Sequence, residues 1–325
     1  MPTPSPNVLN SSPGPRGFLR WVAATIVLTY VLVGVGAFVR VSGAGLGCPD
    51  WPKCFGRWVP PTSAADLPPG VDASKFVPLL TWIEYLNRLV GAALGIFMLV
   101  TLAHAVRHHR TQRAVLWPTV LAFVGVLYAA WLGGRVVAHE LAPWIVTAHL
   151  LSALFVVGSL LVAGANALLA EHPLALPPER RGAFILGLAT WMLTLLQGGL
   201  GTQVRGTIED AVRRTPGLPR GSWVAEAGPL QSGHANLAIL VAAATFALLL
   251  VVMANPLRSR WVTRAAMVSA ALCLLQLSVG LVLAHAAMPR AAQVLHLELG
   301  ALLVGALTVL LHGLARAPST PGAAA

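Results

Sequence analysis

The sequence predicts an all-α membrane protein, a bundle of eight transmembrane helices made of two pseudo-twofold-related four-helix halves. Three observations lead to this fold class. Hydrophobic residues make up 56% of the 325-residue chain and charged residues only 10%, which is unlike a soluble globular domain. Apolar stretches of membrane-spanning length recur along the chain. Polar residues within these stretches repeat at a fixed offset between the two halves.

Eight segments are long and apolar enough to cross a bilayer, because a hydrocarbon core of about 30 Å needs roughly 20 apolar residues per helix. The expected helices cover residues 18–39, 79–105, 115–134, 144–168, 183–204, 229–254, 264–284 and 291–313. The expected divisions are a disordered cytoplasmic tail (1–17), an N-terminal half (18–168), a cytoplasmic linker (169–182), a C-terminal half (183–313) and a cytoplasmic tail (314–325).

Arginines in the short links predict that both termini lie in the cytoplasm. Links 106–114, 169–182 and 255–263 are compact and basic, and short basic loops favour the cytoplasmic side. Long loops count less in this rule, although they also hold basic residues here: Lys53, Arg57, Arg213, Arg214 and Arg220. The first helix is preceded by no basic amphipathic leader, which favours a bacterial plasma membrane.

The net charge of +11 does not indicate a nucleic-acid partner, because the arginines lie between apolar runs rather than on one basic face. We interpret them as helix flanks, contacts to membrane lipid or partners of a cofactor carboxylate. Four lie at the outer boundary, where they could pair with carboxylates or simply anchor the interface: Arg40, Arg88, Arg135 and Arg205.

A polar frame occurs twice in the chain. Two spacings are equal, because 149 − 87 = 62 and 296 − 234 = 62. One shift of 147 relates the two copies: Glu84 onto Gln231, Asn87 onto His234, and His149 onto His296. The residues at both ends of each spacing follow a helix-opening proline by five to nine positions, so we expect them at a similar depth in the outer leaflet.

The second copy has two histidines and so suggests a metal held between two imidazoles. Imidazole inside hydrocarbon is costly and often functional, although a single such histidine can simply bond a neighbouring helix. The pair His234 and His296 suits axial ligation of a haem iron, an arrangement that favours electron transfer. Copper or zinc would require further ligands. The chain has no Cys-x-x-Cys-His motif, so any haem is held without covalent attachment.

In the first copy, His149 is the one evident axial donor, since Asn87 is a poor iron ligand. Glu84 lies three residues before Asn87 and shares its helical face. Two interpretations of this carboxylate remain open. Arg88 could neutralise it, or it could accept a proton or stabilise a developing cation.

Two cysteines share the first long outer loop, and a third, Cys273, lies in an apolar helix as a buried small residue. A zinc site at Cys48 and Cys54 is excluded, because loop 40–78 has no histidine and no third cysteine. The pair is expected to form an external disulfide, with two unpaired thiols as the alternative.

At these residues the chain resembles the haem A synthase family of membrane enzymes. The resemblance spans nearly all of residues 18–313 and is most specific in segments 39–54 (Val-Arg-Val-Ser-Gly-Ala-Gly-Leu-Gly-Cys-Pro-Asp-Trp-Pro-Lys-Cys) and 84–88 (Glu-Tyr-Leu-Asn-Arg) and at the histidines near the helix starts. It implies an oxidoreductase that converts the C8 methyl group of its substrate haem O to a formyl group by successive hydroxylations. It also implies a haem b cofactor on His234 and His296, and a disulfide between Cys48 and Cys54.

For the first half, the resemblance implies a substrate haem site at His149, Asn87 and Arg88, with Glu84 as the catalytic residue. Independently of the resemblance, Arg40, Arg135 and Arg205 are candidate partners of haem propionates, because guanidinium groups pair well with carboxylates. The chain departs from the family pattern at one position, since Asn87 stands where Glu-x-x-His-Arg is usual. Either His149 alone binds the substrate haem, or the activity is modified.

The partners expected with this activity are a haem O synthase that delivers the substrate, membrane lipid and an electron acceptor of unknown identity. A homo-oligomer is left open. The main alternative is a b-type membrane cytochrome that transfers electrons without oxidising a methyl group. A transporter ranks below both, because transporters place polar residues at broken helices near mid-depth, whereas here they crowd one leaflet.

Overall fold

A computed structural model describes residues 14–171, 181–255 and 259–315. Within these ranges it contains eight long helices, each long and apolar enough to cross a membrane. They are α1 (Gly14–Ser42), α2 (Pro78–His108), α3 (Arg113–Ala138), α4 (Pro143–Glu171), α5 (Arg181–Arg214), α6 (Gly228–Ala254), α7 (Arg260–His285) and α8 (Arg290–Ala315). The described part of the chain has no strand, only four short 3-10 turns in its outer loops. The all-α, eight-helix prediction is therefore confirmed.

Helix α5 corrects the predicted boundaries most, because it continues to Arg214 rather than ending at residue 204. The hydropathy of the chain falls where Arg205 begins a charged stretch, but residues 205–214 contain no proline. This last part of α5 is amphipathic. Ile208 packs with Ala227 and Met288 in a small cluster above the bundle, while the ion pair of Arg213 with Asp210 is solvent-exposed. The predicted loop 205–228 is thus largely helix in its first half.

Smaller corrections concern the expected tails and linker. Residues 14–17, assigned to the N-terminal tail, already belong to α1, and α4 extends through residue 171 of the predicted linker. Residues 1–13, 172–180 and 316–325 of the predicted tails and linker lie outside the described residues. Helix α7 begins earlier than expected, at Arg260, because Ser259 caps it by accepting a hydrogen bond from the backbone N–H of Trp261.

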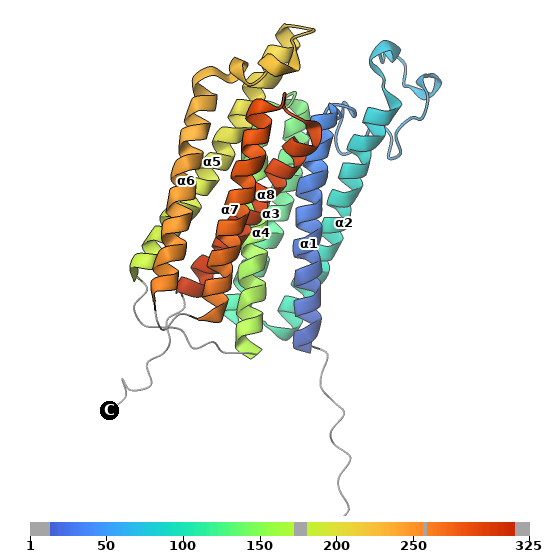
Figure 1. Cartoon of the computed structure of the whole chain (residues 1–325). Helices are drawn as coiled ribbons and strands as arrows, with labels where there is room; N and C mark the ends of the chain where they lie inside the picture. Colours follow the sequence, from blue (N-terminus) through green and yellow to red (C-terminus); the bar gives the residue numbers. More distant parts are fainter. Residues whose placement is uncertain (1–13, 172–180, 256–258, 316–325) are drawn as a thin grey trace, which may run out of the picture.

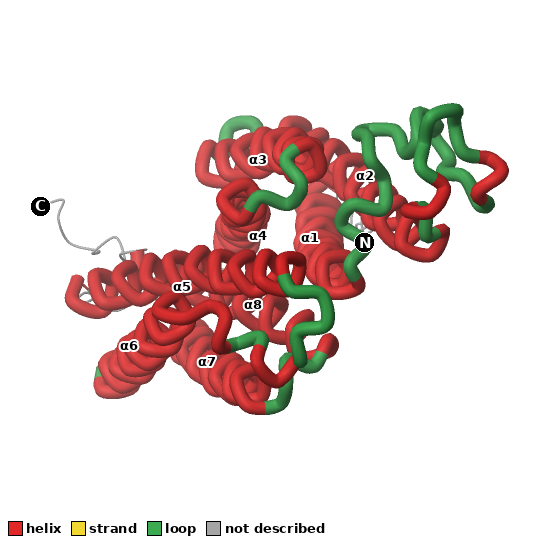
Figure 2. The backbone as a smooth tube through the Cα atoms, turned by 90° about the horizontal axis from the view of Figure 1, so that it is seen from above, coloured by secondary structure: helices red, strands yellow, loops and turns green. Residues whose placement is uncertain are grey.

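The helices form two neighbouring groups of four. Figure 2, a view from above, shows α1–α4 on one side and α5–α8 on the other. Within the first group α1 packs on α2 and α4, and α3 packs on α4; within the second, α5 packs on α6 and α8, and α7 on α8. The groups meet along α1, α4, α5 and α8. The long loops before α2 and α6 both lie at the upper end of the bundle in Figure 1, on opposite sides of it.

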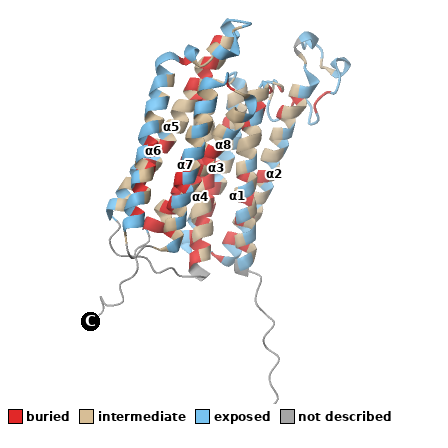
Figure 3. Cartoon of the chain, viewed as in Figure 1, coloured by how far each residue is buried: buried red, intermediate tan, exposed pale blue. Residues whose placement is uncertain are grey.

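Each half has its own apolar core. In the first half Phe18, Met98 and Leu160 belong to one cluster, and in the second Leu248 and Leu307 belong to another. A third cluster joins the halves: Leu154, Ala301 and Val304. Exposed residues cover the outward faces of the helices (Figure 3), and many are large and apolar, including Val27, Ile96, Leu196, Ile239, Leu250 and Leu281. Such a surface suits contact with lipid rather than water.

Polar contacts also tie the two halves together near their outer ends. The hydroxyl of Thr147 in α4 forms a hydrogen bond with that of Thr202 in α5. The side-chain amide of Gln203 also donates to the hydroxyl of Thr147, over 2.7 Å. Gly206 allows α5 to approach α4, since a Cβ at this position would lie 2.5 Å from Cγ of Pro143. The halves are therefore closely packed at the level of the predicted sites.

Candidate functional site

In the second half, the structure brings His234 of α6 and His296 of α8 together. Their ring centroids are 6.3 Å apart and the ring planes cross at 64°. Metal–imidazole bonds of about 2 Å on each side would place two ligating nitrogens about 4 Å apart and the ring centroids about 6 Å apart. The pair therefore fits an iron held between two imidazoles. No group of three or more His, Cys, Asp or Glu side chains that could hold a metal ion occurs in the described ranges.

Each of these imidazoles rests against a glycine of the neighbouring helix. A Cβ on Gly201 of α5 would lie 3.0 Å from Cε1 of His234, and one on Gly280 of α7 would lie 3.3 Å from Cε1 of His296. Real Cβ atoms rarely come this close to a ring atom, so larger residues would displace the rings. The glycines thus let both rings pack edge-on against the helix beside them.

Glutamines lie one helical turn before the same glycines. The amide nitrogens of Gln197 and Gln276 are each 3.3 Å from Nε2, of His234 and His296 respectively. Gln197 also donates to the backbone carbonyl of His234 over 2.9 Å. Sequence reasoning missed both glutamines. The available signal was an amide inside an apolar helix, four residues before a glycine.

The first half repeats this frame with fewer polar groups. His149 of α4 faces Gly133 of α3, where a Cβ would lie 3.6 Å from Cε1 of the ring. Asn87 of α2 stands where the second half has the ring of His234. Gly36 of α1 precedes Arg40 by four residues, as Gly201 precedes Arg205, and no described atom lies within 4 Å of a Cβ built on Gly36. Oδ1 of Asn87 is buried and has no hydrogen-bond partner in the described part of the chain. One imidazole and one amide therefore occupy the places that two imidazoles occupy in the second half.

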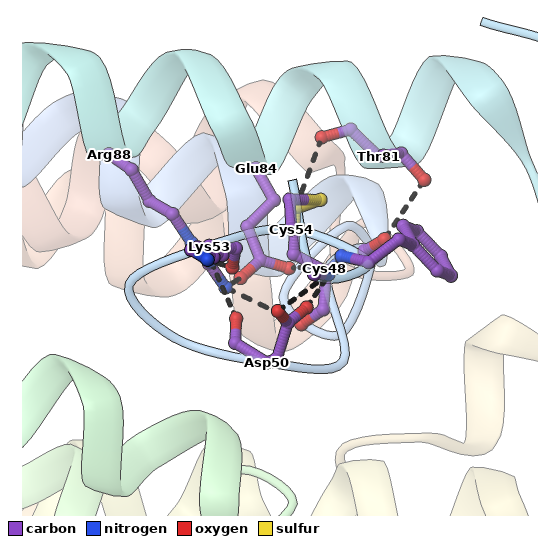
Figure 4. The surroundings of a disulfide bond; sticks show 10 residues. Cys48, Asp50, Lys53, Cys54, Thr81, Glu84 and Arg88 are labelled. Atoms are coloured by element: carbon purple, nitrogen blue, oxygen red, sulfur yellow. Dashed lines mark hydrogen bonds and ion pairs between the residues drawn. A yellow bond between two sulfur atoms is a disulfide. The ribbon is translucent and has the colours of Figure 1, made fainter. Parts of the chain in front are cut away.

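Glu84 is held by the outer loop and by Arg88. Its carboxylate accepts hydrogen bonds from the backbone N–H of Cys48 over 3.0 Å and from the guanidinium of Arg88 over 2.5 Å. Only 3% of Glu84 is exposed. Figure 4 shows both side chains pointing from α2 into the loop. Glu84 and Arg88 therefore form a buried ion pair beneath the loop.

Arg88 also binds the loop directly. It donates to the backbone carbonyls of Asp50 and Lys53, each over 2.7 Å. Asp50 in turn accepts from the backbone N–H groups of Phe55 and Gly56. Arg88, a predicted substrate-site residue, therefore holds the loop in place by hydrogen bonds in this structure.

The predicted disulfide is present, because Cys48 and Cys54 are joined at an S–S distance of 1.99 Å. The cross-linked loop packs tightly on the first half. A Cβ on Gly47 would lie 2.6 Å from the carbonyl oxygen of Leu80, and Trp51 lies against Gly134 of α3. Cys273 is buried and free, as expected. The loop thus covers the outer end of α2 and α3.

Two of the three arginines expected to bind propionates meet a glutamate that sequence reasoning missed. Arg40 of α1 and Arg205 of α5 both donate to Glu209, with shortest distances of 2.8 and 2.7 Å. Nη1 of Arg205 remains buried and unpaired among the described residues. Arg135 instead contacts His139, which lies four residues later at the end of α3. The cluster at Glu209 keeps a net positive charge and joins α1 to α5.

The fold and these residues define a multi-pass membrane protein with two related polar sites, one of them a facing histidine pair. The sequence profile of the COX15-CtaA family, described as cytochrome oxidase assembly protein, matches residues 19–308. This chain belongs to that family.

Several relatives carry the name heme A synthase. The one from Shewanella oneidensis is 30% identical over 151 residues, 44% of each chain, and that from Geobacillus kaustophilus is 31% identical over 123 residues, 38% of this chain and 34% of the relative. The one from Sphingopyxis alaskensis is 27% identical over 217 residues, 60% of this chain and 61% of the relative. The match therefore spans less than two thirds of each relative.

Proposed function

We propose that this chain is a haem A synthase, an oxidoreductase that converts the C8 methyl group of haem O to a formyl group by successive hydroxylations. Its family and the name of its relatives support this proposal. The observation that carries it is the asymmetry between the halves. His234 and His296 face each other in the second half, whereas the first half offers His149 and Asn87 at the same places. A saturated metal suits electron transfer, and an unsaturated one suits reaction.

In the second half, His234 and His296 would hold haem b, which supplies electron transfer when bound. The protein's part is to fix the two imidazoles. Gly201 and Gly280 admit the ring edges, and Nδ1 of both rings is buried. The cationic cluster of Arg40 and Arg205 around Glu209 lies at the outer ends of α1 and α5. The unpaired Nη1 of Arg205 makes it the better candidate for a propionate partner.

In the first half, His149 would bind the substrate haem and orient it beneath the disulfide loop. Glu84 is the group proposed to assist the oxidation. Since Arg88 and the amide of Cys48 hold its carboxylate, we propose that it acts as a fixed negative charge near the reacting methyl group rather than as a free proton acceptor. Arg88 then positions both Glu84 and the loop.

The proposed setting is the bacterial plasma membrane, with both termini in the cytoplasm and the disulfide loop outside. The disulfide supports this orientation, because such bonds persist in oxidising compartments. Haem O would reach the first half from the membrane, supplied by an enzyme that makes it. The electron acceptor and any homo-oligomer are outside the proposal.

Pigment analysis tests this function. The chain is expressed with a supply of haem O, and extracted haems are separated by chromatography. We expect haem A to form, and to disappear in His149→Ala. His285, exposed at the end of α7, provides the matched control, and His285→Ala should behave as wild type. A haem A yield equal to that of cells with empty vector would overturn the proposal.

A b-type membrane cytochrome is the second candidate, favoured by one specific observation. The carboxylate of Glu84 is held by hydrogen bonds from Arg88 and Cys48, and Asn87 is a poor iron ligand. Under this alternative the protein shows a reducible haem b spectrum that is lost in His234→Ala, but no haem O is consumed. Glu84→Gln would then change no turnover.

A further inference from the structure

We propose that Glu209 assigns Arg40, an arginine of the first half, to the haem site of the second half, where the excess positive charge raises the reduction potential. Arg40, Glu209 and Arg205 together form what we call the Glu209 cluster. This inference rests on the proposed function, because it treats His234 and His296 as the ligands of haem b. The cluster residues are outside that ligand set, so they act on the site through their charges.

Helix α5 places the Glu209 cluster one turn outside the histidine pair. Gly201, Arg205 and Glu209 follow one another at intervals of four residues, and residues four apart lie close to one face of a helix. The ring of His234 rests on this face, since a Cβ on Gly201 would lie 3.0 Å from Cε1 of the ring. Arg205 comes about 6 Å further out along the helix axis.

Glu209 binds both guanidinium groups of the cluster. Nε of Arg40 donates to Oε1 of Glu209 over 3.0 Å and Nη2 donates to Oε2 over 2.8 Å. Nε of Arg205 donates to Oε1 over 2.7 Å. The side chains of Arg40, Glu209 and Arg205 are only 14%, 17% and 20% exposed. Two guanidinium charges and one carboxylate leave one positive charge in excess, and partly buried charges are screened much less than exposed ones.

The repeat shows that Arg40 has no acidic partner of its own at the equivalent position. Aligning Arg40 with Arg205 gives a shift of 165, because 205 − 40 = 165. The same shift places Ala44 opposite Glu209, because 209 − 165 = 44. Arg40 pairs instead with the carboxylate of the other half, 169 residues away in the sequence. The second half thus holds the arginine of α1 as well as that of α5.

Stability alone does not account for this arrangement. The attraction within a buried ion pair is largely offset by the hydration that both groups lose. One guanidinium charge stays unbalanced, and Nη1 of Arg205 is buried with no hydrogen-bond partner among the described residues. Buried donors without a partner are costly. An excess positive charge beside the histidine pair has a use if it favours the less positive state of an iron held there.

The sign of the effect follows from electrostatics. Reduction adds one electron to ferric iron and lowers its positive charge by one. A neighbouring positive charge stabilises the ferrous state relative to the ferric state and raises the midpoint potential, whereas a negative charge lowers it. Arg40 and Arg205 should therefore raise the potential. Glu209 lowers it by its own charge but holds Arg40 in place.

Redox titration of the purified protein with haem bound tests the effect of charge. Arg40→Gln and Arg205→Gln should each lower the midpoint potential, with a several-fold shift of the reduction equilibrium towards the ferric form. Arg40→Lys keeps the charge and should stay close to wild type. Arg213, whose ion pair with Asp210 is exposed on the same helix, gives the control Arg213→Gln, and its potential should equal that of wild type.

A double-mutant cycle tests the role of Glu209. Glu209→Ala introduces the residue that the first half carries and releases Arg40. Adding Glu209→Ala to Arg40→Gln should raise the potential above that of Arg40→Gln alone, because a negative charge is removed. Arg40→Gln should change the potential much less in the Glu209→Ala background than in wild type, because Arg40 is no longer held beside the site.

Several results would overturn the inference. One is an Arg40→Gln protein that retains haem at the potential of wild type; if this variant does not retain haem, Arg205→Gln decides by the same criterion. Arg40→Lys with a potential as low as that of Arg40→Gln, or an equal shift in Arg213→Gln, would show that the fold rather than the charge matters. Each of these results leaves the proposed function intact. A wild-type protein without haem b would overturn the proposed function itself.

Discussion

Glu84 and Arg88 lie one turn apart on α2 and form an ion pair of 2.5 Å beneath the disulfide loop. The exposed fractions of the side chains are only 4% and 12%. Removing one partner of a buried pair leaves an uncompensated charge, which costs about 3–5 kcal/mol. The loop depends on this pair, because Cys48, Asp50 and Lys53 all bond to one member of it.

Arg88→Leu should therefore destabilise the protein more than Glu84→Gln. Each change leaves one buried charge without its counter-ion, but Arg88→Leu also removes two hydrogen bonds to the loop, whereas glutamine keeps an oxygen that accepts from the N–H of Cys48. Thermal unfolding in detergent and limited proteolysis of residues 43–77 measure the difference. Arg57→Gln, at an exposed position of the same loop, is the control. Equal melting temperatures for Arg88→Leu and Arg57→Gln would show that the loop does not depend on the pair.

Cys48 and Cys54 should react with a thiol reagent only after reduction, and from the outer side of the membrane. Closing so short a loop stabilises the folded state by about 2 kcal/mol, so the reduced loop should be more sensitive to protease. Labelling of spheroplasts with a membrane-impermeant maleimide, followed by mass spectrometry, checks this. Cys273 is buried in α7 and should stay unlabelled. Labelling that requires disruption of the membrane would reverse the proposed orientation.

Asn87→His should add a second nitrogen ligand to the first half. The space beside Gly36 contains no described atom within 4 Å of a built Cβ, whereas Gly201 at the equivalent place contacts a ring. With a haem bound at His149, the wild-type protein should bind carbon monoxide after reduction, and Asn87→His should bind it much less. Carbon monoxide difference spectra measure this. Equal binding by the two proteins would mean that residue 87 does not face the iron.

The glycines beside the histidines should differ in their tolerance of alanine. A Cβ would lie 3.0 Å from the ring at Gly201 but 3.6 Å at Gly133, an ordinary contact distance. Gly201→Ala should therefore displace His234 and lower the content of haem b several-fold, while Gly133→Ala leaves haem binding nearly unchanged. Gly198, with open space at its Cβ, provides a control on the same helix. Haem content per protein, measured by absorbance after purification, shows which of the two substitutions lowers haem binding more.

Much of the fold follows from the sequence by simple rules. The helices were predicted from apolar length, and the structure places a proline at or next to the start of α2, α4, α6 and α8, as expected. The end of α5 was missed because a hydropathy scan stops at charge, whereas Ile208 and Ala211 continue the buried face of the same helix. Amphipathic helix ends of this kind are found by searching for helical periodicity rather than by averaging hydropathy over a window.

The site was predictable where it repeats and unpredictable where it depends on distant contacts. The shift of 147 identified His234 and His296, and the structure brings their ring centroids to 6.3 Å from each other. Tertiary contacts show that the two loop cysteines form a disulfide and that Glu84 pairs with Arg88. The contact of Glu209 with Arg40 could not be foreseen, because the two residues lie 169 positions apart in the sequence. Gln197 and Gln276 left only a weak local signal.

The absorbance spectrum of the purified protein tests the twin-site arrangement with the fewest assumptions. After growth with ample iron and a haem precursor, the wild-type protein should show a reducible low-spin haem b spectrum. His234→Ala and His296→Ala should each abolish it, whereas His149→Ala and His285→Ala should preserve it. A colourless wild-type protein, or a spectrum that survives in His234→Ala, would contradict the proposal that facing imidazoles hold a haem in the second half.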